Sequence, residues 1–434
     1  IKMIEILFIF LQLLFLIIFF SGPFYFLNLN SFSFLNLNFF DYFGINILIN
    51  ITFLLVCSFF NLKILYIFYS IIFFNLFLLF KNKNLIRNKL KNFQNLKLIL
   101  FFITCLISIS FYLAYDPTLS WDGIEHWFWK ALNYNQSGTY ENLKNMPLAY
   151  YPHLGSYIWG FFWSINPINL EYLGRFFYIL IFLIPFFSAS YRFGEVKDEY
   201  KIIIILILII FALDRFLLGG YQEFFLFYLF YMFSLIYYTK KNNNNLFLTI
   251  LIFISSSLMI WVKQEGLFYH IILSLVYILS SRSKIINKLI YLSCSFLIIF
   301  LMIEIRKHFH GNFSLNEEFF HSELLRYLNI TILIKSIFYI SIEIIKGFIK
   351  YPLWILIILF FLLDLFRDKK FIDIKYIFFI LFISFIFAIY LQTNMDMRQL
   401  MPLTLDRILF HGSGFYLIYI FKKIKELTFN NFFT

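Results

Sequence analysis

The chain has 434 residues, of which 62% are apolar and only 14% are charged, whereas about 25% of the residues are charged in an ordinary soluble domain. A soluble fold of this size could not cover so much apolar surface with polar side chains. The 36 Lys and Arg residues exceed the 24 Asp and Glu residues, but they are divided among short loops, which excludes a basic nucleic-acid-binding face. The composition therefore predicts an integral membrane protein.

Apolar blocks recur along the whole chain, with lengths near the roughly 20 residues that a helix needs to cross a bilayer. They lie at 4–20, 46–61, 64–80, 97–115, 173–191, 201–214, 216–238, 246–262, 266–280, 288–303, 352–366, 374–392 and 408–421. Barrel strands are excluded because they would alternate apolar and polar residues. The sequence predicts an all-α, polytopic transmembrane helical bundle of about 11 to 13 spans, with juxtamembrane helices on the outer face.

The first blocks are interpreted as an N-terminal transmembrane extension, residues 1–95, that precedes a core at 96–425. The block 4–20 lacks a small-residue cleavage site and is followed by further spans, so we interpret it as a first span or anchor. The three cysteines, Cys57, Cys105 and Cys294, all lie within apolar blocks and have neither zinc nor disulfide spacing. They are predicted to be small buried side chains.

The loops between the blocks are of two kinds. The segment 81–97 carries six basic residues and no acidic one, and the positive-inside rule places such a loop in the cytoplasm. The loops predicted on the opposite side, 116–152, 304–350 and 393–407, mix acids and bases, with aromatic residues and histidines in the first two. Plain positive charge on one side and mixed chemistry on the other indicate a membrane enzyme with an external active site.

Two segments do not fit a simple pattern of spans. The block 153–165 is too short to cross a bilayer, so we expect it to be re-entrant or interfacial. The segment 331–350 places four charged residues close to one helical face, with Ile and Phe opposite. This pattern predicts an amphipathic helix that lies on the outer leaflet.

The richest stretch for chemistry follows the span at 97–115. It brings Asp116, Asp122, Glu125, His126 and Lys130 to the membrane surface within 15 residues. If 121–132 is helical, the two acids and the histidine from 122 to 126 share one face. A carboxylate in such a place can act as a general base toward a hydroxyl group. The alternative is a solvated loop, anchored by tryptophans, whose charges face water.

Several charged residues elsewhere have both a structural and a functional interpretation. Glu223 lies inside an apolar block, where a carboxylate is expensive, and Arg215 is its expected structural partner. Lys263 could pair with Glu265, and Arg407 could pair with Asp406 or extend to the interface. The loop that contains His308, His310, His321 and three glutamates has no regular metal-ligand spacing. It is predicted to be a solvated loop, with no metal site.

The order of these motifs resembles the C-type glycosyltransferase superfamily, which includes protein O-mannosyltransferases and lipid A aminoarabinose transferases. The closest pattern is that of a bacterial branch with an SWD…W…KA outer loop, here Ser120–Asp122, Trp127 and Lys130–Ala131, followed by YPHLGSYIW at 151–159. Weaker similarities run down the chain at 220–223 (GYQE), 263–266 (KQEG) and 405–411 (LDRILFH). The resemblance covers about 95–420. It departs from the mannosyltransferases in lacking their Asp-Glu pair, since Glu125 stands three residues after Asp122.

This resemblance implies transfer of a sugar from a polyprenyl-phosphate carrier to an acceptor outside the cytoplasm, with inversion. Asp122 would deprotonate the acceptor hydroxyl, with Glu125 and Asp116 as the other candidates. The departing phosphate needs positive charge near it, and the resemblance together with the chemistry of the guanidinium group points to Arg407, Arg398 and Lys263. The donor or acceptor pocket would then include the following residues: His126, Lys130, Tyr151, His153, Glu223 and Glu265.

The implied partners are a lipid-linked sugar donor, a glycan, lipid or protein acceptor, and membrane lipids, but no nucleic acid. No cofactor is required, and assistance of the phosphate by a divalent cation is left open. The implied location is a bacterial inner membrane, with the active site facing the periplasm. The alternative function is a transporter or flippase for a lipid-linked or small substrate, which should carry ionisable residues at broken helices in repeated halves. A purely structural or assembly protein is a third alternative.

Overall fold

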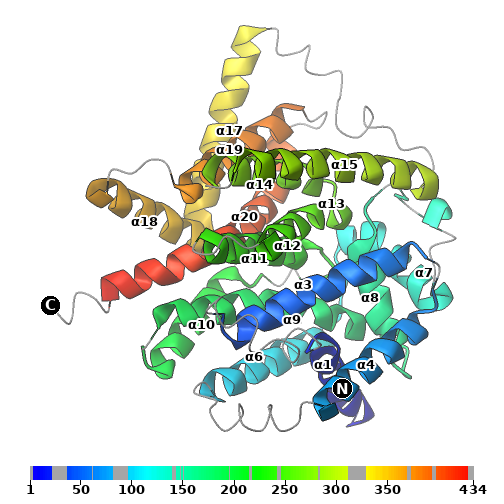
Figure 1. Cartoon of the computed structure of the whole chain (residues 1–434). Coiled ribbons are helices and arrows are strands. Elements are labelled where there is room, and N and C mark those ends of the chain that lie inside the picture. Colours follow the sequence, from blue (N-terminus) through cyan, green and yellow to red (C-terminus); the bar gives the residue numbers. More distant parts are fainter. Residues whose placement is uncertain are drawn as a thin grey trace.

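The computed structural model describes residues 3–21, 37–60, 62–81, 96–138, 143–146, 148–149, 151–194, 196–214, 218–241, 246–281, 284–310, 329–368, 373–392 and 397–428. Every regular element in these ranges is a helix. The helices pack as one bundle (Figure 1). The predicted all-α, polytopic helical fold is therefore confirmed.

The first half of the bundle is formed by α1, α3, α4, α6, α7, α8, α9 and α10. Their bounds are Met3–Phe20, Phe39–Ser58, Ile64–Lys81, Leu96–Tyr115, Trp129–Ser137, Leu154–Ser164, Tyr172–Ser190 and Asp198–Ala212. Long apolar runs favour helices here because each helix satisfies its own backbone hydrogen bonds in lipid. The start of α3 is fixed by a capping box. The Asn38 side chain accepts a hydrogen bond from the Asp41 backbone N–H at 2.9 Å, and the Asp41 carboxylate accepts one from the Asn38 backbone N–H.

The second half of the bundle is formed by α11 to α15 and α17 to α20. Their bounds are Glu223–Lys241, Leu246–Ser257, Met259–Val262, Gly266–Ser280, Ile285–His310, Ile330–Lys350, Pro352–Asp368, Ile374–Gln392 and Met397–Thr428. In Figure 1 the helices α1, α4 and α6 lie along one side of the molecule, and α17 and α18 lie along the opposite side. Helices α9 and α11 run between them.

The core of the bundle is built on α9, α11 and α20. Every residue of α9 is buried, and α11 is buried from Glu223 to Tyr237. Helix α20 packs against α11, and the approach is very close at Gly414, because a Cβ atom added there would lie 2.3 Å from the Phe227 carbonyl oxygen. Small residues permit such backbone contacts between membrane helices. The register between α11 and α20 is thereby fixed.

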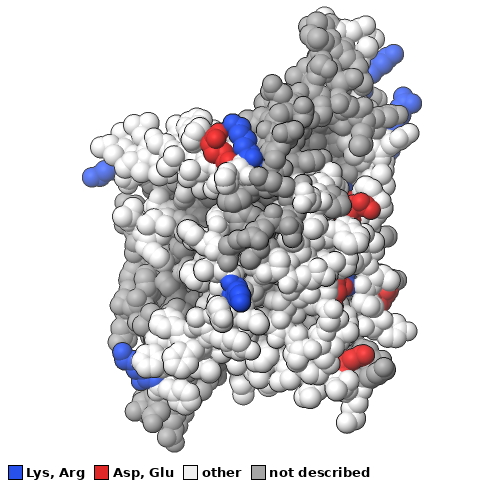
Figure 2. Space-filling model, turned by 90° about the vertical axis from the view of Figure 1, so that its right-hand side faces the viewer, with Lys and Arg blue, Asp and Glu red and all other residues white. Residues whose placement is uncertain are grey.

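The number of long spans is smaller than predicted. Six helices in the described ranges are long and apolar enough to cross a membrane, or seven if the bent pair α17–α18 counts as one span. The apolar blocks at 64–80, 246–262 and 266–280 form shorter apolar helices instead. On the face shown in Figure 2, the charged residues among the described atoms are few and lie apart on a largely uncharged surface. Both observations agree with a membrane-type bundle.

The two segments that did not fit a simple pattern of spans, 153–165 and 331–350, both form helices. Helix α8 has 11 residues, all buried from Leu154 to Trp163, so it is too short to span a bilayer and is enclosed by other helices. Helix α17 forms at Ile330–Lys350, as its amphipathic pattern predicted, and bends by 100° into α18. The position of α17 on the outer leaflet stays a prediction.

The predicted N-terminal extension packs on the same core as the rest of the chain. Gln12 of α1 donates from its side-chain nitrogen to the carbonyl oxygens of Phe162 and Leu173, at 2.9 and 3.1 Å. Helix α3 contacts α8 and α9, and α4 contacts α1 and α8. The first three helices therefore support the segment that carries the site described next.

Candidate functional site

Five charged side chains from four distant segments meet at one end of α11. Arg407 of α20 donates to the Asp122 carboxylate and lies 3.7 Å from Oε1 of Glu223, the first residue of α11. The Nζ atom of Lys263, between α13 and α14, lies 3.0 Å from the same Glu223 oxygen and 3.5 Å from Oε1 of Glu265. These five residues form a series in which acidic and basic groups alternate, and we name this series the ion-pair chain: Asp122, Arg407, Glu223, Lys263 and Glu265.

Burial is greatest in the middle of the ion-pair chain, at Glu223 and Lys263, and both ends are partly exposed, with 30% of the Glu265 side chain accessible. The Glu223 side chain is fully buried, whereas 20% of the Asp122 side chain and 23% of the Arg407 side chain are exposed. Burial alone would lower the pKa of Lys263, but the charges of Glu223 and Glu265 outweigh it and raise this pKa. Burial opposes the charged form of Glu265 too, yet the neighbouring Lys263 lowers its pKa. Both shifts favour the charged forms of Lys263 and Glu265, and the Asp122 end of the ion-pair chain offers a carboxylate beside a guanidinium group.

Asp122 is positioned by a helix that differs from the one expected. Residues 121–137 are helical, as predicted, but Gly123–Phe128 form a π-helical turn, η2, ahead of α7. The wider turn alters the spacing on which the prediction of one shared face was based. Asp122 and His126 still interact electrostatically. Glu125 is half-buried and, within the described part of the chain, belongs to none of the ion pairs.

A close backbone contact holds this turn against the segment before α11. The Ser120 N–H donates to the Gly219 carbonyl oxygen at 3.0 Å, and the Ser120 hydroxyl donates to the same oxygen at 2.9 Å. Gly123 faces that oxygen so closely that an added Cβ atom would lie 2.1 Å from it. Only glycine fits at this position without a shift of the backbone.

We expect Gly123→Ala to lower the free energy of unfolding by about 1–3 kcal/mol, the usual range for overpacking. The added methyl group must push the η2 turn away from Gly219. Thermal unfolding of the purified protein in detergent measures the effect. The exposed neighbour Ile124 provides the control, since Ile124→Ala should stay within about 0.5 kcal/mol of the wild type. Equal melting temperatures for Gly123→Ala and the wild type would contradict the contact.

Arg175, which the sequence pattern did not single out, joins the two loops that carry Asp122 and Glu223. Its guanidinium group is buried and donates to the carbonyl oxygens of Pro117 and Leu218, at 2.6 and 2.8 Å. It also lies 2.8 Å from Glu171 in an i,i+4 pair at the start of α9. A charged pair at the edge of a fully apolar block was the sequence signal that could have identified it.

Three predicted pocket residues, Lys130, His126 and Tyr151, have mainly local contacts, whereas a fourth, His153, contacts α3. Lys130 is buried and donates to the carbonyl oxygens of Leu148 and Tyr151, at 2.7 and 3.0 Å. The His126 ring stacks on the Tyr151 ring, with 4.6 Å between centroids, and burial lowers the pKa of His126. His153 is buried at the start of α8, and its Nε2 atom lies 3.0 Å from the Ser58 hydroxyl. These residues are placed around the turn that holds Asp122.

We expect His153 to make the fold sensitive to acid. Burial, assisted by the charges of Lys130 and Arg306, lowers the pKa of His153 to about 3. The unfolded chain, with a histidine pKa near 6.5, therefore binds the proton more tightly, so stability falls as the pH drops below about 6.5. Between pH 7 and pH 5 the wild type should lose about 2 kcal/mol more than His153→Phe. Unfolding curves at both pH values measure this difference, and parallel losses in the two proteins would contradict it.

The other predicted site residues lie apart from the ion-pair chain. Asp116 accepts from the Thr118 hydroxyl at 2.8 Å. It lines a cavity of about 540 Å³ together with Ser120 and Tyr221. The Tyr221 ring lies under the Arg407 guanidinium group, at 5.0 Å from the centroid, so this cavity adjoins the Asp122 end of the ion-pair chain. Arg398 is exposed in the first turn of α20.

The expected pair Arg407–Asp406 is replaced by longer-range pairs, whereas the expected pair Lys263–Glu265 is present. Asp406 pairs with Lys350 of α17, and Arg407 pairs with Asp122 instead. Lys263 pairs with Glu265, as one interpretation held, but also with Glu223.

Some of the residues nominated from the sequence lie outside the part of the chain that the structure describes. They are Arg215, His321 and the glutamates of the 311–328 loop. Within the described ranges, no three His, Cys, Asp or Glu residues are grouped so that they could hold a metal ion. No protein-family model, curated protein or solved structure matches this chain.

Proposed function

We propose that the protein is a membrane glycosyltransferase that moves a sugar from a polyprenyl-phosphate carrier to an acceptor hydroxyl, with inversion. One observation carries the proposal: Asp122 and Arg407, 285 positions apart, meet at a partly exposed end of a chain of ion pairs whose centre is buried. An inverting transfer needs a general base on the acceptor side of the anomeric carbon and a cation on the phosphate side, so this pair has to separate to admit the donor between its two side chains. The cavity lined by Tyr221 adjoins this pair, because Arg407 lies over the Tyr221 ring.

The proposed reaction needs one base and one cation. A carboxylate oxygen of Asp122 takes the proton of the acceptor hydroxyl while the acceptor oxygen forms a bond to the anomeric carbon. The bond between that carbon and the phosphate oxygen breaks, and its electron pair leaves with the polyprenyl phosphate. Arg407 stabilises this anion through its planar fork, and Lys263 adds positive charge behind it. Glu125 and Asp116 remain the other candidates for the base.

The charge pattern supports this division of roles. Arg407 contacts the partly exposed Asp122 on one side and approaches the buried Glu223 on the other. Because Glu223 and Lys263 already form a close pair at 3.0 Å, the guanidinium group can turn toward an incoming phosphate without leaving a buried carboxylate unpaired. A preorganised cation of this kind requires little rearrangement when negative charge develops.

The proposed setting is a bacterial inner membrane with the ion-pair chain toward the periplasm. The positive-inside rule supports this orientation, because 81–97, rich in Lys and Arg, would face the cytoplasm. The proposed partners are a lipid-linked sugar and a glycan, lipid or protein acceptor.

A transporter or flippase is the second candidate, and one observation favours it. Lys263 and Glu265 lie at a break between α13, of four residues, and α14. Transporters often place charged binding groups at interrupted helices. A transporter would bind its substrate at the same ion pairs but would form no covalent product.

A transfer assay in proteoliposomes distinguishes the two functions. The full chain is offered a panel of radiolabelled polyprenyl-phosphate sugars together with extracted cell-envelope acceptors. Labelled product that requires the protein supports the transferase. Protein-dependent movement of the carrier lipid between leaflets, with no labelled product from any donor, would replace the transferase with the flippase.

A further inference from the structure

A second cavity lies at the far end of α11 from the ion-pair chain. It has a volume of about 540 Å³ and lies between α12 and α15, beside the end of α11; it is named here the α12–α15 pocket. Glu223 and Lys240 mark the two ends of α11, 17 residues apart in sequence, which corresponds to roughly 25 Å along a helix. That length approaches the thickness of the hydrocarbon core of a bilayer. The pocket therefore belongs to a different region of the molecule from the proposed active site.

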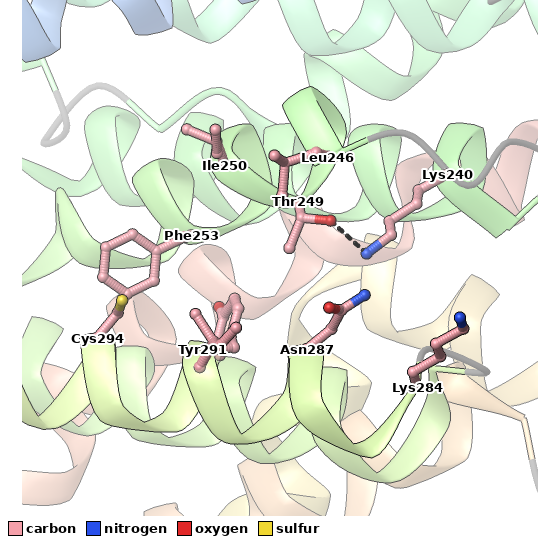
Figure 3. A pocket seen from close by; sticks show the side chains of 10 residues that line it. Lys240, Leu246, Thr249, Ile250, Phe253, Lys284, Asn287, Tyr291 and Cys294 are labelled. Carbon is pink, nitrogen blue, oxygen red and sulfur yellow. Dashed lines mark hydrogen bonds between the residues drawn. The ribbon is translucent and has the colours of Figure 1, made fainter.

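The two ends of the α12–α15 pocket differ in chemistry. Figure 3 shows Lys240, Lys284 and Asn287 gathered at one end, and Phe253 and Cys294 at the other. No acidic residue is among the described residues that line the pocket. The pocket therefore has one basic end and one apolar end.

Lys240 is held in place at the basic end. Its side chain is buried, with 8% exposed, and its ammonium group donates to the hydroxyl groups of Thr249 and Tyr277. The same group lies 4.7 Å from the centroid of the Tyr277 ring. Lys284 is exposed at the rim. One fixed, largely desolvated cation and one exposed cation at the rim suit an anion that is partly enclosed.

The apolar end opens onto surface that faces away from the core. Ile250 and Ile290 line the pocket and remain 47% and 57% exposed. Helix α15 is one of the six candidate spans, and little of it is buried inside the protein. In a membrane these side chains would contact acyl chains, so an apolar chain can enter the pocket sideways from the bilayer.

We propose that the α12–α15 pocket binds a lipid that carries a phosphate group. The phosphate is held by Lys240 and Lys284, and the apolar chain lies against Ile250, Phe253 and Cys294. Basic pockets between helices on the cytoplasmic side of a membrane are suited to anionic head groups. A bilayer phospholipid and a polyprenyl phosphate share this chemistry. The site is separate from the proposed transfer reaction and does not depend on it.

Protection of Cys294 from a maleimide tests the proposal. Cys294 lines the pocket and is partly exposed, so the full chain with Cys57→Ser and Cys105→Ser carries one reporter thiol. Modification rates are measured in neutral detergent with added phosphatidylglycerol, polyprenyl phosphate, phosphatidylcholine or inorganic phosphate. We expect the first two to slow modification in a saturable way and the last two to leave it unchanged. The more protective of the first two identifies the source of the ligand.

Lysine variants locate the head group. Removing both lysines, with Lys240→Gln and Lys284→Gln, should raise the concentration for half-protection about thirty-fold. Lys284→Gln alone should raise the concentration for half-protection about five-fold. Because Lys284 is exposed, this variant tests the basic end even if a change at the buried Lys240 disturbs folding. Lys97→Gln, which removes an equal charge at an exposed position of α6, is the matched control and should change nothing.

Three results would overturn the proposal. They are equal protection by phosphatidylcholine, protection by inorganic phosphate alone, and unchanged protection in the Lys284→Gln variant. A protein that retains only Cys105, on α6, reports general effects of the lipid on the detergent micelle. Equal protection of that thiol would also count against a specific site.

Discussion

Asp122→Asn is expected to abolish sugar transfer while the protein still inserts and folds. The amide keeps the shape of the carboxylate and can still accept a hydrogen bond from Arg407, but it cannot take a proton from an acceptor hydroxyl. General-base catalysis contributes about 10²–10⁴-fold, and kcat for transfer should fall by that factor. The proteoliposome assay with labelled donor measures the loss.

Glu125→Gln and Asp116→Asn are the controls for Asp122→Asn. Glu125 belongs to none of the ion pairs among the described residues, and Asp116 accepts a hydrogen bond from the Thr118 hydroxyl. Both variants should keep most of the activity. Full transfer by Asp122→Asn, with loss in either control, would move the base role to the residue that was lost.

Arg407→Ala is expected to impair use of the donor much more than use of the acceptor. The variant removes the only cation that contacts Asp122 in the described structure and leaves Glu223 with Lys263 alone. Loss of one group that stabilises developing negative charge costs about 10²–10³-fold, so kcat/KM for the donor should fall by that amount. Arg407→Lys keeps the charge but loses the planar fork, and it should recover only part of the activity.

Steady-state kinetics with donor and acceptor varied in turn measure this asymmetry. Arg398→Ala is the matched control, because Arg398 is exposed in the first turn of the same helix. It should leave the donor kcat/KM within about two-fold of the wild type, as expected for an exposed charge. An Arg407→Ala protein with an unchanged KM and kcat for the donor would contradict contact between Arg407 and the phosphate.

The helical, membrane-type fold could be predicted from the sequence because apolar blocks allow few other solutions in lipid. The span count was less predictable. Block 266–280, for example, is apolar but forms a helix of only 15 residues, and α11 begins at a buried acid, Glu223. Block length alone does not show how much of a helix lies inside the protein. Helix α8 illustrates this, since its residues are apolar because they are enclosed.

The members of the ion-pair chain could be nominated from the sequence, but not their pairing. Arg215, the expected partner of Glu223, lies outside the described residues, and among the described residues Glu223 pairs with Lys263 and Arg407. These contacts depend on how α11 and α20 pack, which local spacing does not encode. The π-helical turn at Gly123–Phe128 and the buried Arg175 were missed for the same reason. Both are explained by backbone contacts between distant loops.

The contact between Gly414 and Phe227 has a consequence for how the molecule can move. Because backbone meets side chain and carbonyl so closely there, α11 and α20 cannot slide past each other without a clash, and they behave as one rigid body. Glu223 belongs to α11 and Arg407 belongs to α20. Any opening that admits a substrate must therefore come from the surrounding helices or loops or from rotation of the side chains themselves, while the backbones at these two positions keep a constant separation. An alternating-access motion would have to occur between other pairs of helices.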